Sequence, residues 1–178
     1  DGEPVTAAAP AEEDKAGGDQ GDEAEEEDDD KMPDNECDAE VWRVEKEMKT
    51  MTAEQKLERA TLWKTTGNEC FKQSELFKAT DAYYHAILFS RELMNNPQYY
   101  PKLKHTPEQR KTAQDLCESA YTNLALVQLK HAVAMPEDHA DRRGLLEEVA
   151  RSASEALKIN AKNAKALFRR AQARAALA

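Results

Sequence analysis

Two polar residues four positions apart, Lys64 and Asn68, carry the clearest sign of binding chemistry in this chain. On a helix this spacing places both side chains on one face. The lysine ammonium and the asparagine amide both donate hydrogen bonds, so together they suit a ligand with oxygen acceptors. Asparagine is a poor residue for a helix interior, and its place inside a helical pattern is a second sign of a functional role.

Residues of the catalytic and metal-binding types form no comparable arrangement. The cluster Glu137-Asp138-His139-Asp141 is more typical of a solvated loop than of a cation site. The chain has no Ser-His-Asp, Cys-His or paired-carboxylate pattern, and it has no glycine-rich phosphate loop. We therefore expect a binding protein without catalytic residues, cofactor or metal. The histidines that lack any ligand spacing are His85, His105, His131 and His139.

Charge divides the chain into two parts. Residues 1–40 carry 18 Asp and Glu against 2 Lys, a net charge of −16, whereas the other 138 residues carry 17 against 23, a net charge of +6. The first part has almost no large apolar side chains, so it cannot bury enough surface to offset chain entropy. The composition predicts a disordered acidic tail over residues 1–40 and a folded domain over residues 41–178.

Three roles are open for the acidic tail. The favoured role is that of a solvated linker. In the second, the acidic run at residues 25–30 folds back on a basic surface of the domain and competes with its ligand, with a dependence on ionic strength. In the third, the tail contacts a basic partner. Nucleic acid is a disfavoured partner because the tail would repel phosphates.

The expected cellular compartment follows from the absence of membrane and export signals in the sequence. No apolar run approaches the roughly 20 residues that span a bilayer, and no basic-then-apolar signal segment opens the chain. Cys37, Cys70 and Cys117 are widely spaced and odd in number, which suits a reducing compartment. We expect a cytoplasmic protein, with the nucleus as the alternative, and no membrane partner. A helical pattern that stops at Ala178, in a chain without an initial Met, is typical of a fragment.

Apolar spacing and helix caps predict an all-α domain. Two capping boxes open helices, Thr52 with Gln55 and Thr106 with Gln109. Residues 41–50 form either a short helix or an ordered approach segment. The expected helices span about 52–73, 76–94, 107–131, 141–159 and 163–176. The aromatic side chains that we assign to their core are Trp63, Phe71, Phe77, Tyr83 and Phe168.

Four stretches of the chain carry a family resemblance. They are Trp42 followed by Met51-Thr-Ala-Glu-Gln-Lys-Leu-Glu58, Lys64-x-x-Gly67-Asn68-x-x-Phe71-Lys72, Asn123-Leu-Ala-x-x-x-Leu-Lys130, and Asn163-x-Lys165-Ala-Leu-Phe-Arg169-Arg170. With small residues at the close approach of paired helices, the hairpin that begins near Ala60 resembles a tetratricopeptide repeat, and later repeats begin near Glu118 and Ala164. Residues 42–178 are most similar to the repeat domains of large immunophilins (FKBP type) and of relatives of the aryl-hydrocarbon-receptor-interacting protein.

This resemblance implies a right-handed superhelix of stacked helix hairpins, about two and a half repeats long. It also implies a co-chaperone that binds the C-terminal Glu-Glu-Val-Asp tail of the heat-shock chaperones of ninety and seventy kilodaltons. Such domains hold the tail in a two-carboxylate clamp, with Lys and Asn on the first helix, Asn on the third, and Lys and Arg on the fifth. The matching residues are Lys64, Asn68, Asn123, Lys165 and Arg169, with Arg170 and Lys162 as secondary groove residues.

Two features of the sequence bear on this clamp. The spacing of the first two repeats exceeds the 34-residue period by 24 residues, and the clamp requires that this excess leave Asn123 in register with the first helix. The apolar Leu167 and Phe168 of the last helix are expected to meet an intermolecular partner or residues beyond this sequence. The clamp is chemically reasonable, because a chain-terminal Asp offers two neighbouring carboxylates to cations and amide donors.

Two other functions stay open from the sequence. In one, the chain is the docking half of a larger peptidyl-prolyl isomerase whose catalytic domain lies outside it. In the other, it is a general scaffold of the same repeat type that binds internal peptides, and blocking the carboxyl terminus of the ligand would then have no effect.

Overall fold

The computed structural model describes residues 35–94 and 104–178. Every regular element within these two ranges is helical, as expected for an all-α protein. The elements are α1 (Glu36–Thr50), α2 (Ala53–Lys72), α3 (Leu76–Arg91), the short 3₁₀-helix η1 (Glu92–Met94), α4 (Pro107–Ala134), α5 (Ala140–Ile159) and α6 (Ala164–Leu177).

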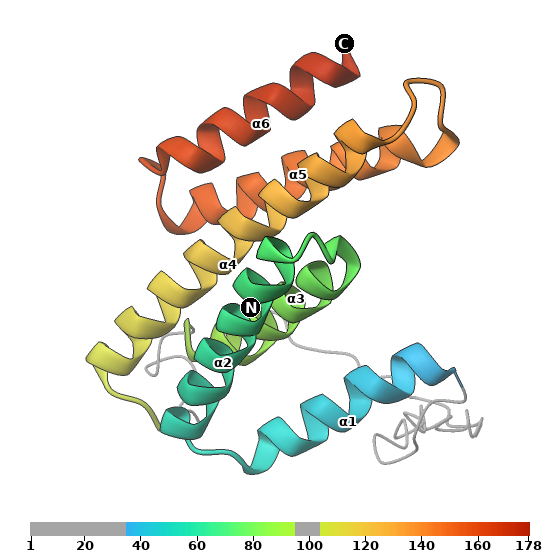
Figure 1. Cartoon of the computed structure of the whole chain (residues 1–178). Helices are drawn as coiled ribbons and strands as arrows, with labels where there is room; N and C mark the ends of the chain where they lie inside the picture. The colour runs from blue at the N-terminus through green and yellow to red at the C-terminus, as the bar shows by residue number, and fades with distance from the viewer. Residues whose placement is uncertain (1–34, 95–103) are drawn as a thin grey trace, which may run out of the picture.

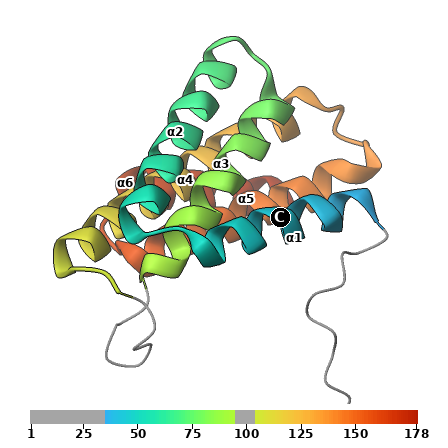
Figure 2. The ribbon, with the colours of Figure 1, turned by 90° about the horizontal axis from the view of Figure 1, so that it is seen from below.

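The helices stack in chain order (Figure 1). Helix α2 packs on α3 and α4 packs on α5, while α3 and α5 each also contact the helix that follows. Further contacts join alternate helices, α2 to α4 and α4 to α6. Helix α1 lies at one end of the stack and α6 at the other, and Figure 2 shows the molecule from the α1 side. As a result, α2, α4 and α6 are successive neighbours along one face.

Both predicted capping boxes are confirmed. Thr52 Oγ1 accepts a hydrogen bond from the Gln55 backbone N–H at 3.3 Å, and Gln55 Oε1 accepts one from the Thr52 N–H at 2.8 Å. Thr106 and Gln109 form the same pair at 3.1 and 2.8 Å, with Pro107 at the start of the helix. These pairs fix the beginnings of α2 and α4, the helices that carry the first three candidate site residues.

Small residues let α2 and α3 approach closely. The chain reverses between them at Ser74, whose φ of 63° lies in the left-handed region. Gly67 then contacts the ring of Tyr83 so closely that a Cβ at position 67 would lie 2.8 Å from Tyr83 Cε1. Ala79 and Ala86 are buried in the same cluster. The α2–α3 interface therefore depends on the absence of a side chain at Gly67.

Three of the five aromatic side chains assigned to the core pack there. Tyr83 is 1% exposed, and Trp63 and Phe71 are half-buried against the same cluster. The assignment of Phe77 is wrong, because this residue is 76% exposed. Phe77 lies in the first turn of α3, where its ring meets that of His131 edge-on, with the ring centroids 4.7 Å apart.

Phe168 is the second error in the predicted core, because it is 65% exposed. Helix α6 packs through Ala166 and Ala173, which are fully buried. Phe168 follows Ala166 by two residues, about 200° around the helix, so it points away from this contact. Leu167 is also exposed. That Leu167 and Phe168 meet a partner or further residues stays a prediction.

The predicted boundary of the acidic tail is also corrected. Helix α1 begins at Glu36, inside the segment 1–40 for which we predicted disorder. The helix covers residues 41–50, for which a helix was one of two expectations, and its Met48 packs with Phe89 in the core. Residues 1–34 of the predicted tail, including the acidic run at 25–30, lie outside the described residues.

Candidate functional site

Hydrogen bonds join α2, α3 and α4 at the side chain of Asn68. Asn68 Oδ1 accepts one from the Tyr83 hydroxyl at 2.7 Å and one from Asn123 Nδ2 at 3.1 Å. Both asparagines are half-buried, and Tyr83 is buried. With its oxygen occupied by two donors, Asn68 retains its Nδ2 hydrogens as donors for a ligand.

Arg169 of α6 reaches the same region of α4. Its Nη1 donates a hydrogen bond to the backbone carbonyl of Thr122, the residue before Asn123. Burial lowers the pKa of Arg169. Burial raises the pKa of Tyr83, and the hydrogen bond from Asn123 and the charge of Arg169 oppose that shift. Within the described part of the chain Arg169 has no carboxylate partner, so guanidinium donors are left over.

Two lysines flank this cluster. Lys64 lies one helical turn before Asn68 and is half-buried, and Lys165 lies one turn before Arg169 and is exposed. Among the residues that the structure describes, neither ammonium has a hydrogen-bond or ion-pair partner. Other lysines of the chain do pair with carboxylates: Lys56, Lys78, Lys111 and Lys158. The cluster is therefore bordered by positive charge that this part of the protein does not neutralise.

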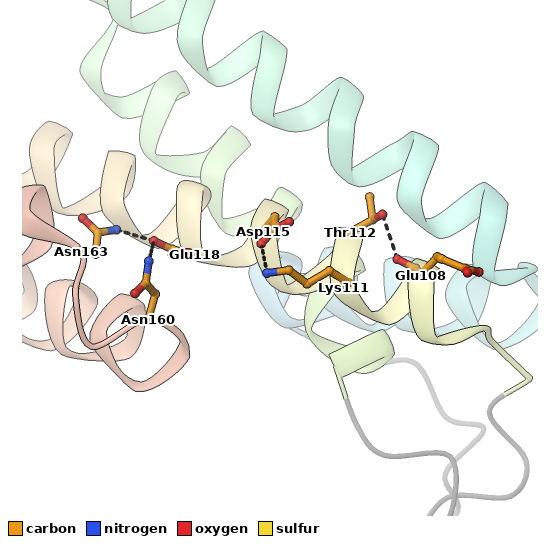
Figure 3. A network of polar contacts seen from close by, with 7 residues as sticks. All are labelled: Glu108, Lys111, Thr112, Asp115, Glu118, Asn160 and Asn163. Atoms are coloured by element: carbon orange, nitrogen blue, oxygen red, sulfur yellow. Dashed lines mark hydrogen bonds and ion pairs between the residues drawn. The ribbon is translucent and has the colours of Figure 1, made fainter.

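A polar network holds the start of α6 against α4 (Figure 3). Glu118 Oε1 accepts hydrogen bonds from Asn160 Nδ2 at 2.9 Å and from Asn163 Nδ2 at 2.8 Å. Asn163 Nδ2 also donates to Thr122 Oγ1 at 2.9 Å, and Asn163 Oδ1 caps α6 by accepting from the Ala166 N–H at 3.0 Å. This network positions the helix that carries the last two site residues.

The five predicted clamp residues therefore divide into two groups. Asn68, Asn123 and Arg169 form a cluster around Tyr83 and the α4 backbone, whereas the two lysines lie one turn away and form no hydrogen bond to it. Of the secondary residues, Arg170 is half-buried and Lys162 is exposed in the α5–α6 turn, and neither side chain is hydrogen-bonded to a clamp residue.

A mainly apolar groove of about 460 Å³ lies on the same three helices. Phe71, Leu126 and Gln172 line it, and each follows a cluster residue by three positions, so the groove lies one turn further along α2, α4 and α6. Lys130 also lines the groove, with its Nζ 4.7 Å from the centroid of the Phe71 ring. A ligand held at the cluster has room to extend an apolar side chain into this groove.

Sequence reasoning missed several of these contributors. It assigned Tyr83 and Phe71 to the core without a ligand role, and it gave no role to the polar network of Glu118. A signal for the groove was present, because the three-residue step that places Phe71 after Asn68 recurs on the other two helices. The pairing of the Tyr83 hydroxyl with Asn68 has no such signal, since it depends on the crossing of two helices.

Comparisons of the sequence with protein-family models and with curated proteins find no match. In the described ranges, no group of three or more His, Cys, Asp or Glu side chains is arranged to hold a metal ion. None of the helices there combines the length and apolar character that a membrane span requires.

Proposed function

We propose that this protein is an interaction module of the tetratricopeptide type that binds the C-terminal carboxylates of acidic peptides. The observation that carries the proposal is a set of donors on three neighbouring helices that lack carboxylate partners in the described part of the protein. Such donors suit a ligand that brings several carboxylate oxygens. The residues proposed to bind are Lys64, Asn68, Asn123, Lys165 and Arg169.

The helix arrangement supports this class of protein. Hairpins α2–α3 and α4–α5 are followed by α6, and the first helices of the successive units contact one another. In stacked helical repeats, equivalent helices line one concave surface, on which side chains of different repeats converge. We therefore propose a right-handed superhelix of about two and a half repeats, with the donor cluster on its concave side.

A chain-terminal Asp is the ligand group that fits best. It offers an α-carboxylate and a side-chain carboxylate close together. Arg169 can bind a carboxylate through two parallel hydrogen bonds, whereas Lys64 and Lys165 act as point charges. Each charge-assisted hydrogen bond contributes roughly 1.5 to 3 kcal/mol, but the peptide loses conformational freedom on binding. The expected affinity is about micromolar.

The apolar groove adds a preference for an apolar residue upstream of the terminal Asp. The peptide Met-Glu-Glu-Val-Asp combines apolar residues with the Glu-Glu-Val-Asp ending that the family resemblance implies for heat-shock chaperones. We therefore propose a cytoplasmic co-chaperone that docks on the C-terminal tail of chaperones of the ninety- or the seventy-kilodalton class. In this proposal the chain acts without catalytic residues or a cofactor.

Calorimetric titration with Met-Glu-Glu-Val-Asp tests this function. Replacing Lys165 and Arg169 together by Ala is expected to weaken binding by roughly 100-fold, because two cationic donors are lost. The matched control is Arg174→Ala, which removes an exposed cation from the same helix outside the cluster. The control should bind like the wild type. Equal affinity in the double variant and the wild type would rule out the clamp.

A further inference from the structure

We propose that Tyr83 is a positioning residue of the carboxylate site: its hydroxyl holds the Asn68 side chain in the orientation that presents Nδ2 to the ligand. This inference rests on the proposed function and names a residue outside the five-residue clamp. Tyr83 belongs to α3, the second helix of the hairpin, so it acts on the ligand through Asn68 rather than by contact.

The geometry of Tyr83 directs its hydroxyl hydrogen at the side chain of Asn68. The side chain is 1% exposed, and its O–H donates to Asn68 Oδ1 at 2.7 Å. The ring reaches this position because it packs over Gly67, where no Cβ stands in the way. A phenol keeps its hydrogen at neutral pH and so remains a donor, and burial moves the pKa of Tyr83 further from neutrality.

A buried hydroxyl is a poor choice for packing alone. A Phe would fill the same volume without removing a polar group from water, a removal that costs free energy unless a hydrogen bond is formed. Here that hydrogen bond goes to the side chain of a candidate ligand-binding residue rather than to a backbone carbonyl. The arrangement therefore links the core of the hairpin to the binding surface.

The orientation of the Asn68 amide decides whether it attracts or repels a carboxylate. Its Nδ2 donates hydrogen bonds, whereas its Oδ1 would face the ligand oxygens with a like partial charge. Donation from both Tyr83 and Asn123 keeps Oδ1 turned into the protein. Without the Tyr83 hydroxyl, only Asn123 donates to Asn68 Oδ1. The Asn68 amide can then rotate about its last side-chain bond.

The test uses Tyr83→Phe, with Tyr84→Phe as a matched control. The neighbouring Tyr84 points elsewhere, because its hydroxyl is 3.4 Å from Gln128 Nε2 and has no contact with the clamp. Each protein is titrated with Met-Glu-Glu-Val-Asp as the free acid and as the C-terminal amide. Tyr83→Phe should weaken binding of the free-acid peptide by about five- to tenfold. It should also reduce the ratio by which the protein prefers the free acid to the amide. Tyr84→Phe should change neither.

A second readout needs no peptide. The side-chain amide resonances of Asn68, assigned with an Asn68→Ser variant, should shift or broaden in Tyr83→Phe and remain unchanged in Tyr84→Phe. Unchanged resonances, or an equal loss of affinity for the free-acid and amide peptides, would overturn the positioning role. If the resonances change but the wild-type protein does not prefer the free acid, the positioning of Asn68 is supported and the proposed function fails. The two failures are therefore distinguishable.

Discussion

Asn123 and Asn68 are joined side chain to side chain, Nδ2 to Oδ1 at 3.1 Å, although 55 residues separate them in the chain. The segment that connects the α2–α3 hairpin to the α4–α5 hairpin therefore leaves Asn68 and Asn123 within hydrogen-bond distance. One reason is visible in α4, which has 28 residues against 20 in α2 and so takes up part of the extra length as helix. The 24-residue excess in the spacing of the first two predicted repeats therefore does not move Asn123 away from Asn68.

A matched pair of glycines tests the close approach of α2 and α3. Gly67→Ala should lower the free energy of unfolding by about 1 kcal/mol, because the clash with the buried Tyr83 ring exceeds the gain in helix propensity. Gly144→Ala should raise it by up to about 1 kcal/mol, since position 144 is helical and has nothing within 4 Å of an added Cβ. Urea unfolding of both variants measures the difference.

The two substitutions share the same chemistry, so their opposite signs isolate the effect of the Tyr83 contact. If Gly67→Ala stabilised the protein as much as Gly144→Ala, the close packing of α2 on α3 would be wrong. Because Tyr83 also contacts Asn68, Gly67→Ala should weaken binding of the free-acid peptide, whereas Gly144→Ala should leave it unchanged.

Local signals in the sequence predicted much of the fold. Capping residues such as Thr52 and Thr106 act within one turn, so their pattern alone fixes where a helix begins. The exposure of Phe77 and Phe168 was not predictable in the same way. Both are large and apolar, yet the buried contacts of their helices are made by other residues, such as Tyr83 in α3 and Ala166 in α6, because the face that a helix buries depends on its neighbours.

The candidate site shows the same division between local and tertiary information. Spacing along one helix identified Lys64 with Asn68, because four residues make one turn. The hydrogen bond from Tyr83 to Asn68 and that from Arg169 to the Thr122 carbonyl cross between helices. Such contacts depend on the crossing geometry, which no local pattern encodes.

The anchor of α6 on α4 is tested at Glu118. Glu118→Ala removes the acceptor of two amide hydrogen bonds and should lower the free energy of unfolding by about 1 to 2 kcal/mol. Glu118→Gln keeps an acceptor oxygen and should stay close to the wild type. Hydrogen exchange of the α6 backbone amides should quicken in the Ala variant only. Unchanged exchange there would show that the Glu118 hydrogen bonds do not anchor α6.

Alkaline pH should destabilise the protein through Cys117. Burial raises the pKa of this thiol from the ordinary value of 9.0 to about 11. Between these values the unfolded chain loses the proton while the folded protein keeps it, so the free energy of unfolding falls as pH rises from 9 to 11. Urea unfolding across this range should show a shallower fall in Cys117→Ala.

Tyrosines also ionise in this range, and the pKa values of Tyr83, Tyr84 and Tyr121 are raised by burial, so some decline will remain in the variant. The tyrosines contribute equally to the fall in the free energy of unfolding of both proteins, so the difference between wild type and Cys117→Ala reports the thiol. Identical pH dependence in the wild type and Cys117→Ala would contradict the assignment of the effect to the buried thiol.

The central claim, that the cluster around Asn68 and Arg169 binds a terminal carboxylate, is tested most directly by one comparison. The dissociation constants of Met-Glu-Glu-Val-Asp with a free C-terminus and with a C-terminal amide are measured by calorimetry on the wild-type protein. We predict that amidation weakens binding at least tenfold, because it removes one of the two charges of the terminal Asp. Equal dissociation constants for the two peptides would contradict the claim.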